Sequence, residues 1–366
     1  MTIKHLLAPL QLGALALPNR LVMAPLTRQR SLPGNVPGEL NARYYAQRAN
    51  AGLIISEASQ VCPEGQGYAW TPGIHSDAQV AGWQQVTQAV HQAGGRIFLQ
   101  LWHVGRISHP LLQPNGADPV APSAIQAKAE CYVVEADGSH HKAATAMPRA
   151  LELDELPGVV TAYAHGSENA IKAGFDGVEV HAANGYLLDQ FLCSNSNQRS
   201  DAYGGSVENR ARFVLEVLDA TVAAVGDSRK VGIRISPMGT FGDVHDANPL
   251  ETFSYLVSQL NSRNLAYLHV NRPDWLGGTF EGFDDLLRAL RDIYKGTLII
   301  AGGQTAESGE QAIANNLADL VAYGRPYIAN PDLLARFKAG AELNPLDGNT
   351  LYGGGAEGYT DYPTLS

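Results

Sequence analysis

Eight short apolar segments recur along the chain, and most of the intervals between them have the periodicity of amphipathic helices. Short apolar runs of this kind predict buried strands. The eight runs are residues 21–24, 53–56, 97–101, 178–180, 231–235, 267–270, 298–300 and 320–322. The segments with helical periodicity include residues 77–93, 156–173, 207–225, 249–263, 283–294 and 306–316.

Regular alternation of strands and helices predicts parallel strands joined by right-handed crossovers. Eight such units predict an α/β protein of the (β/α)8 TIM-barrel class, with all 366 residues in a single domain. A doubly wound open sheet is the alternative, and it accounts less well for eight evenly spread strands.

Three segments lie outside this repeat. Residues 103–150, rich in Pro, Gly, His and Ser, interrupt it between the third and fourth strands and are predicted to be a capping insertion over the barrel mouth. Within them, residues 131–135 and 140–142 are expected to pair as a hairpin. Residues 1–18 are expected to cap the opposite face, and residues 342–366 to form a tail near the active-site mouth.

Composition and charge exclude several classes of protein. A net charge of -10 without a basic run gives no support for binding nucleic acid or an acidic membrane. No apolar run is long enough to span a bilayer, and the first residues lack the long apolar region of a signal peptide. We therefore expect a cytoplasmic protein that acts on a small molecule, as a monomer or a homodimer.

The cysteines argue against a metal centre. Cys62, Cys131 and Cys193 are far apart, and the chain contains no C-x-x-C motif. Neither an iron–sulfur cluster nor a cysteine-rich zinc site is expected. An odd number of scattered cysteines is typical of a reducing compartment.

Polar residues and glycines gather where the predicted strands end. The carboxyl ends of parallel strands meet at one face of a barrel, and active sites lie at that face. The residues at or just beyond these ends are Pro25, Thr27, Glu57, Ala58, Gln100, Trp102, His103, His181, Arg234, Asn271, Ala301, Gly302, Gly303, Gly324 and Arg325.

The decapeptide G-V-E-V-H-A-A-N-G-Y at residues 177–186 brings His181, Asn184 and Tyr186 to one strand end. An imidazole and a carboxamide offer two hydrogen-bond donors to a substrate oxygen, and a phenol is a weak acid that can deliver a proton. The alternatives are a histidine that only supports a site from behind and an Asn-Gly pair that only makes a turn.

Glycines follow the seventh and eighth strands, at Gly302, Gly303 and Gly324, and Arg325 adds a positive charge beside them. Loops in these positions of a barrel commonly bind phosphate, because a glycine has no Cβ to keep the ligand from the backbone N–H groups. A simple turn is the alternative for Gly302 and Gly303. The pairing of these glycines with Arg325 favours a phosphate site.

Several longer motifs match a known family. They are P-N-R-L-V-M-A-P-L-T-R at 18–28, G-L-I-I-S-E-A at 52–58, Q-L-W-H-V-G-R at 100–106, V-E-V-H-A-A-N-G-Y-L-L-D-Q-F-L at 178–192, S-N-Q-R-S-D-A-Y-G-G-S-V-E-N-R-A-R-F at 196–213, Y-G-R-P-Y-I-A-N-P-D-L at 323–333 and Y-G-G-G-A-E-G-Y-T-D-Y-P at 352–363. Over nearly its whole length the chain resembles the Old Yellow Enzyme family of FMN-dependent ene-reductases. The resemblance is greatest to the bacterial subgroup of N-ethylmaleimide, pentaerythritol-tetranitrate and morphinone reductases.

The resemblance implies roles for most of the residues at the strand ends. His181 and Asn184 would bind the substrate oxygen above the flavin, and Tyr186 would supply the proton. Thr27 would contact the flavin C4 carbonyl, Gln100 and Arg234 the pyrimidine edge. Pro25 and Ala58 would pack near the ring, and the phosphate would lie at Gly302, Gly303, Gly324 and Arg325. Ala301 would also contact the cofactor. The substrate pocket would be walled by Tyr68, Trp102 and Tyr352.

Two positions distinguish branches of the family. Position 184 is Asn here, where some close bacterial relatives carry His, and both donate a hydrogen bond. Thr27 stands where another branch carries Cys. The larger dienoyl-CoA reductases add an iron–sulfur cluster and further domains, for which this chain has neither the cysteines nor the length.

The activity implied by the resemblance is an FMN-dependent oxidoreductase that reduces C=C bonds. NADPH, or less favourably NADH, would reduce non-covalently bound FMN, which would then reduce α,β-unsaturated carbonyls, maleimides and nitro-olefins, and also nitrate esters. From the residues alone, two alternatives stay open. One is a flavin-free barrel lyase or isomerase with the same phosphate site, and the other is a non-catalytic flavin- or phenol-binding protein.

Overall fold

The structure is a computed structural model that describes residues 3–135, 137–273 and 281–365. Its centre is a nine-stranded sheet in which β5 pairs only with the end of β6, so the remaining eight strands form the ring. All pairings within the ring are parallel. The ring strands are β3 (Leu21–Met23), β4 (Leu53–Ile55), β6 (Ile97–Trp102), β11 (Gly177–Ala182), β12 (Val231–Ile235), β13 (Tyr267–Asn271), β14 (Leu298–Ala301) and β15 (Leu320–Tyr323).

The pairing of β11 with β6 closes the ring and confirms the TIM barrel over the open sheet. Each predicted strand is present, but several extend beyond the predicted ends. His181 and Ala182 belong to β11, so His181 lies within the strand and does not follow it. The apolar run stops early in the sequence because alternate residues point into the barrel, and several of those are polar.

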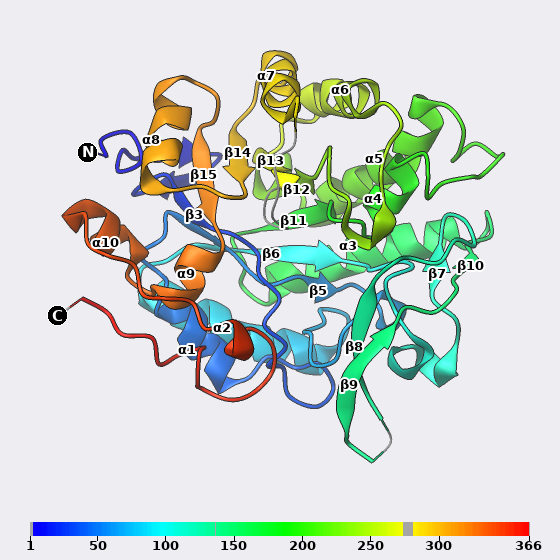
Figure 1. Cartoon of the computed structure of the whole chain (residues 1–366), viewed down its shortest axis with the longest axis horizontal. Helices are drawn as coiled ribbons and strands as arrows, with labels where there is room; N and C mark the ends of the chain where they lie inside the picture. The colour runs from blue at the N-terminus through cyan, green and yellow to red at the C-terminus, as the bar shows by residue number, and fades with distance from the viewer. Residues whose placement is uncertain (1–2, 136, 274–280, 366) are drawn as a thin grey trace.

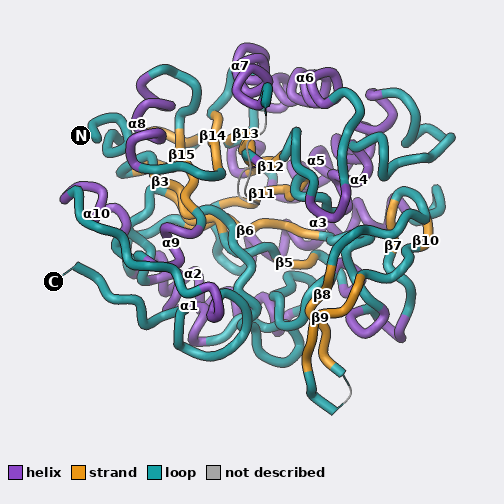
Figure 2. The backbone as a smooth tube through the Cα atoms, viewed as in Figure 1, coloured by secondary structure: helices purple, strands orange, loops and turns teal. Residues whose placement is uncertain are grey.

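Helices surround the ring, as Figure 1 and Figure 2 show. They are α1 (Glu39–Ala46), α2 (Asp77–Gln92), α3 (Leu156–Lys172), α4 (Leu187–Leu192), α5 (Val207–Val225), α6 (Pro249–Leu260), α7 (Phe283–Ile293), α8 (Ala306–Ala314), α9 (Arg325–Ala329) and α10 (Leu333–Ala339). The segment predicted as one helix over 249–263 ends as an α-helix at Leu260 and continues as a 3-10 turn, Asn261–Arg263. Asn264 then adopts a left-handed conformation, which terminates the helix.

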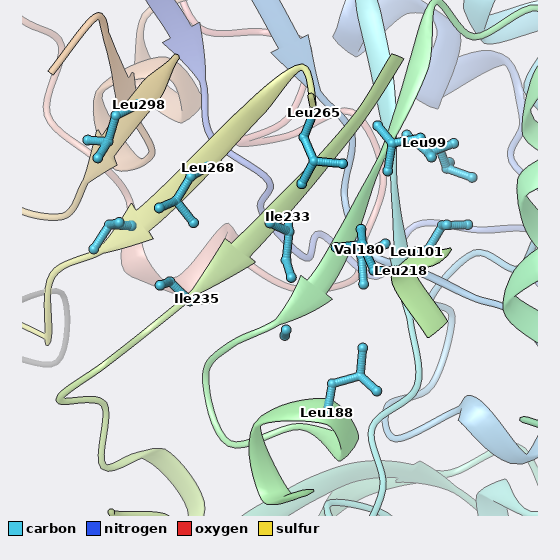
Figure 3. Packing of buried hydrophobic residues seen from close by; sticks show 14 of the residues in the cluster. Leu99, Leu101, Val180, Leu188, Leu218, Ile233, Ile235, Leu265, Leu268 and Leu298 are labelled. Carbon is cyan, nitrogen blue, oxygen red and sulfur yellow. The ribbon is translucent and has the colours of Figure 1, made fainter. Parts of the chain in front are cut away.

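The main core lies between the strands and the helices. Figure 3 shows apolar side chains such as Leu99, Val180, Ile233 and Leu268 on the outward faces of neighbouring strands, where they pack with Leu218 of α5. These positions alternate with inward-facing ones along each strand. The alternation explains why the strands read as apolar runs that contain single polar residues.

The inside of the barrel is apolar on one side and polar on the other. Inward residues of β3, β4, β14 and β15 belong to a second core cluster, for example Val22, Leu53, Ile299 and Leu320. Inward residues of β6, β11, β12 and β13 include buried polar side chains, namely Gln100, Glu179, His181, Arg234, His269 and Asn271. The polar side is therefore built from the strands that carry Gln100, His181 and Arg234 of the predicted site.

Outside the ring, the amino-terminal hairpin lies across the end of the barrel where the strands begin. It consists of β1 (Leu10–Leu12) and β2 (Leu15–Leu17), which pair in antiparallel fashion. Leu12 and Leu17 are buried in the cluster inside the barrel, together with Phe98 and Tyr267.

The insertion between β6 and β11 contains the predicted hairpin, with slightly different ends. β8 (Glu130–Val134) pairs with β9 (His140–Ala144) in antiparallel register, with Val134 opposite His140. Figure 1 shows this hairpin projecting from the barrel. Two short strands, β7 (Val120–Ala121) and β10 (Arg149–Ala150), pair at the base of the insertion.

The carboxyl-terminal tail is attached to the barrel by buried arginines. Arg28 donates hydrogen bonds to the carbonyls of Leu351 (2.9 Å) and Gly358 (2.8 Å). Tyr359 of the tail stacks on Tyr44 of α1 at 4.1 Å between ring centroids, and the Arg28 guanidinium lies over both rings. These contacts keep the tail beside the carboxyl ends of the strands.

A prediction about the barrel interior concerns Gly232 of β12. A Cβ at this position would lie 2.3 Å from Cε2 of the buried Tyr267 ring. Gly232→Ala should therefore overpack the interior and lower the free energy of unfolding by about 1–3 kcal/mol, as measured by urea denaturation. Gly348→Ala is the control, because nothing lies within 4 Å of a Cβ there. Equal stability of the two variants would contradict the prediction.

Candidate active site

A cavity of about 710 Å³ opens at the carboxyl ends of the strands. All the site residues predicted from the sequence line it. They are Pro25, Thr27, Ala58, Tyr68, Gln100, Trp102, His181, Asn184, Tyr186, Arg234, Ala301, Gly302, Gly303, Gly324, Arg325 and Tyr352. Two other strand-end residues, Glu57 and His103, are not among its lining.

Both of these residues have structural partners instead. The Glu57 carboxylate accepts hydrogen bonds from the Tyr45 hydroxyl (3.2 Å) and the Arg28 backbone N–H (3.3 Å). Nδ1 of His103 accepts a hydrogen bond from the Gly105 N–H (3.1 Å). Burial lowers the pKa of His103 to about 4, so this imidazole is neutral and supports the loop after β6.

His181 presents a neutral imidazole to the cavity. Burial, together with the nearby Arg234 and His269, holds the pKa of His181 well below its usual range. Its Nδ1 atom is buried and makes no hydrogen bond to the described residues. A neutral imidazole carries one N–H, so His181 can donate one hydrogen bond without bringing a positive charge.

Asn184 reaches the cavity from a turn that demands unusual backbone angles. Its φ is +57° and that of Gly185 is +75°, and both lie in the left-handed region that Asn and Gly tolerate best. The Asn184 N–H donates to Ser236 Oγ (2.6 Å), and the Gly185 N–H donates to Asp189 Oδ2 (2.8 Å). The positive φ values explain why an Asn-Gly pair stands here, and the two hydrogen bonds hold the turn in place.

The orientation of the Asn184 amide follows from Arg234. Arg234 Nη2 donates to Asn271 Oδ1 (2.8 Å), and Asn271 Nδ2 donates to Asn184 Oδ1 (3.1 Å). A guanidinium can only donate, so each amide in this series must accept on the Arg234 side. The NH2 group of Asn184 is left as the donor for a ligand. Asn271 thus positions Asn184, a role that its place at a strand end did not reveal.

Tyr186 lies beside His181, with 5.2 Å between the ring centroids, and against Trp102 at 5.0 Å. Its hydroxyl lies 3.2 Å from that of Tyr68, and either oxygen can be the donor. The surrounding protein raises the pKa of Tyr186 above its usual value, mainly because the phenolate would be poorly solvated. Tyr186 therefore carries its proton at neutral pH.

The other end of the cavity is formed by backbone. Gly302 and Gly303, after β14, have φ values of +97° and +59°, which favour glycine over any residue with a Cβ. Gly324 and the exposed Arg325 follow β15, the neighbouring strand in the ring. Accessible backbone groups beside an arginine suit a phosphate.

Some residues of the rim were not predicted as site residues. Tyr132 and Lys142 of the β8–β9 hairpin line the cavity, as do Phe241, Ile328 and Leu351. They come from loops, the hairpin, α9 and the tail, whose positions follow from tertiary packing. Only the position of the strand ends could be read from the apolar pattern.

A model of the NADH:flavin oxidoreductase / NADH oxidase family matches residues 5–344. The chain belongs to this family. It is 45% identical to 12-oxophytodienoate reductase 1 of Oryza sativa subsp. japonica over 366 residues, which is 98% of this chain and 93% of the relative. It is 42% identical to the flavin oxidoreductase hxnT of Emericella nidulans over 395 residues, covering 99% and 98% of the two chains.

Solved structures give the same result. Morphinone reductase in complex with tetrahydroNAD is 52% identical and superposes with a TM-score of 0.95, covering 99% of this chain and 98% of that one. An Old Yellow Enzyme homologue from Zymomonas mobilis is 41% identical, with a TM-score of 0.94 and coverage of 99% and 100%. These findings confirm the resemblance to the Old Yellow Enzyme family and its morphinone reductase-like subgroup.

The family identifies the protein as a flavin oxidoreductase that uses FMN and a nicotinamide hydride donor. This result argues against a flavin-free lyase and against a non-catalytic flavin-binding protein. The chemistry of the cavity fits FMN. Arg234 Nε and His181 Nδ1 are buried without a partner among the described residues, and two such groups in one cavity are suited to a polar ring. The glycines and Arg325 lie where a phosphate would be held.

Within the described ranges, no helix combines the length and the apolar character needed to cross a membrane. In the same part of the chain, no three His, Cys, Asp or Glu side chains are grouped so as to hold a metal ion.

A pH-dependent prediction follows from Asp189, whose Oδ2 accepts from the Gly185 N–H (2.8 Å) and the Ser236 hydroxyl (3.2 Å). Burial raises the pKa of this carboxyl to about 7, whereas an unfolded aspartate has a pKa of about 3.9. The folded state therefore binds the proton more tightly. The stability that this proton gives is complete below pH ~4 and is lost as the pH rises to ~7.

Asp189→Asn keeps the acceptor oxygen and cannot ionise. The melting temperature of the variant, relative to the parent protein, should therefore rise between pH 4 and pH 8. Asp154→Asn, at an exposed position, is the control and should show a constant difference. A difference for Asp189→Asn that does not change with pH would show that Asp189 does not titrate in this range.

Proposed function

We propose that this protein is an NAD(P)H-dependent ene-reductase that reduces the C=C bond of α,β-unsaturated carbonyls, maleimides and nitro-olefins, and that also accepts nitrate esters. The observation that carries the proposal is the arrangement of two neutral donors, His181 and the NH2 of Asn184, beside the protonated Tyr186 in one cavity. These groups match the needs of an alkene conjugated to an oxygen-bearing group.

The cofactor would be held non-covalently by both ends of the cavity. Gln100, Arg234, Thr27 and His181 would contact the polar parts of the ring, with Pro25 and Ala58 packed near it. The phosphate would be bound at Gly302, Gly303, Gly324 and Arg325, and Ala301 would also contact the cofactor. Bound FMN supplies the hydride, taken from a nicotinamide nucleotide and delivered to the substrate.

His181 and Asn184 bind and polarise the substrate. Their N–H groups donate to its carbonyl or nitro oxygen and withdraw electrons from the conjugated C=C bond. Both donors bind that oxygen more strongly as negative charge develops on it, as in an oxyanion hole. Arg234, through Asn271, keeps the Asn184 donor in place before the substrate arrives.

Tyr186 donates the proton that the substrate α-carbon needs. Its raised pKa keeps the proton on the phenol until a strongly basic carbon develops next to it. Tyr68, Trp102 and Tyr352 would form the walls of the substrate pocket. Tyr352 is 60% exposed, so it lies at the outer edge of the cavity.

In this proposal the whole chain is a single FMN-binding domain. Residues 1–18 would cap the amino-terminal end of the barrel, while the insertion at 103–150 and the tail at 342–366 would border the substrate entrance. Of these ranges, residues 1–2, 136 and 366 lie outside the described residues. The side chains of Lys142 in the hairpin and Tyr352 in the tail line the same cavity, which supports this division.

The test of the proposal is an anaerobic titration. Purified protein should be yellow and should release FMN and not FAD on acid treatment. NADPH should bleach the flavin absorbance, and subsequent addition of cyclohexenone should restore it. Release of FAD would contradict the cofactor site. Bleaching without recovery on addition of cyclohexenone, a maleimide or a nitro-olefin would contradict the ene-reductase activity.

Tyr186→Phe tests the proton donor. The change keeps the ring, so bleaching of the flavin by NADPH should proceed at a near-normal rate. Recovery by cyclohexenone should be slower by ~10²–10⁴-fold, the usual contribution of general acid catalysis. Recovery by a nitro-olefin should be less affected, because the nitronate that forms is stable enough to take its proton from water. Stopped-flow absorbance measures both steps.

Tyr68→Phe is the matched control, because it removes the hydroxyl that pairs with Tyr186 and leaves the Tyr186 hydroxyl present. Its recovery by cyclohexenone should be much less affected. Equal losses in both steps for Tyr186→Phe would indicate a misplaced flavin. A near-normal recovery with cyclohexenone would assign the proton to another donor.

A further inference from the structure

Glu179 is a carboxyl group in the interior of the barrel to which the proposed mechanism gives no role. It is completely buried on β11, between Gln100 of β6 and His269 of β13. Its Oε1 accepts from Gln100 Nε2 (2.7 Å), and its Oε2 lies 2.8 Å from His269 Nδ1. Glu179 does not line the cavity, whereas Gln100 does. Its influence on a ligand must therefore pass through Gln100 or through its charge.

The contact with Gln100 decides which end of that amide faces the cavity. An ionised carboxylate can only accept, so it holds the NH2 group of Gln100. The carbonyl oxygen of Gln100 is then the group left for a ligand. In a reversed amide, two acceptor oxygens would face each other at hydrogen-bond distance inside the protein, which is unfavourable. Glu179 thus makes Gln100 an acceptor, which suits the imide N–H of a flavin pyrimidine ring.

The charge of Glu179 also acts on Arg234, two residues along the inner face of the neighbouring strand β12 from the position paired with Glu179. Arg234 is itself buried, and Glu179 favours its charged form. His269, the other partner of Glu179, is held neutral by burial and by Arg234. The buried charges of Arg234 and Glu179 therefore oppose each other beneath the same edge of the cavity.

We propose that Glu179 is a positioning residue for FMN, which fixes Gln100 as an acceptor and reduces the effect of the Arg234 charge on the reduced cofactor. This inference rests on the proposed function. Reduced flavin carries more negative charge at its pyrimidine edge than oxidised flavin. A carboxylate behind that edge lowers the reduction potential that Arg234 alone would produce.

Glu179→Gln tests the charge, because it preserves the shape of the side chain. The two-electron reduction equilibrium of the bound FMN should shift toward the reduced form by about tenfold, a rise of about 30 mV in midpoint potential. The potential is measured by anaerobic dye-coupled titration of the holoprotein. A potential equal to that of the parent protein would overturn the proposal.

Glu57→Gln is the matched control. It makes the same chemical change at another buried carboxyl near a strand end, one that contacts Tyr45 and does not line the cavity. It should leave the midpoint potential within error of the parent value. An equal rise in both variants would overturn the proposal, since it would mean that any buried carboxylate sets the potential.

Glu179→Asp tests the contact with Gln100 separately from the charge. It tests the positioning role even if Glu179→Gln does not fold. The shorter side chain keeps the charge but cannot span the distance from β11 to both partners. We expect the potential to stay near the parent value while FMN binds to the apoprotein several-fold more weakly, as measured by quenching of FMN fluorescence. Parent-like affinity in Glu179→Asp would overturn the positioning role.

The parent protein separates this inference from the proposed function. If it fails to bind FMN, the proposed function is wrong. If it binds FMN and reduces cyclohexenone while the position-179 variants show parent-like potentials and affinities, only the role of Glu179 is wrong. The potential and the affinity are both independent of turnover, so a general loss of activity cannot imitate the expected result.

Discussion

The polar half of the barrel interior depends on two buried charges, Arg234 and Glu179. One group can only donate hydrogen bonds and the other can only accept them. Asn271 and Asn184 are oriented outward from Arg234, and Gln100 is oriented by Glu179. The donors and acceptors offered to the cavity are therefore set by charges that do not have to move during a reaction. A site prepared in this way avoids reorganisation when charge develops on a ligand.

The remainder of the fold supports this half of the barrel. The strands opposite, β14, β15, β3 and β4, fill the interior with apolar side chains and leave backbone at the cavity edge. The hairpin of the insertion and the carboxyl-terminal tail line the sides of the cavity. The tail has little regular structure, so its position depends on Arg28 and the stacked rings of Tyr44 and Tyr359.

Most of the fold and much of the site were predictable from the sequence because a parallel barrel places all its strand ends at one face. The outward residues of each strand are apolar and mark its position. The strand ends were misjudged where an inward polar residue, such as His181, interrupts the run. Short α1 and α4 were missed because six to eight residues contain too few turns to show a helical period.

Glu179, His269 and Asn271 show what the sequence could not reveal. Each lies in or at the end of a strand, but its role depends on which residue of another strand it meets. That register is set by closure of the ring, which pairs Glu179 with Gln100 across β11 and β6. A carboxylate between two valines in a buried strand was the available signal. The signal shows that Glu179 needs a polar partner. Only the closed barrel shows that this partner is Gln100, a residue that lines the cavity.

In the proposed function, the donors nearest the substrate, His181 and Asn184, are neutral, and the charged Arg234 lies behind them. A protonated His181 beside Arg234 would place two positive charges in one buried site, and the low pKa of His181 prevents this. In the proposed function, the substrate oxygen would meet donors whose attraction grows with the charge that develops on it. A fixed cation at the same place would bind anions strongly at rest. The structure places its cation, Arg234, one step back, where it orients the Asn184 amide through Asn271.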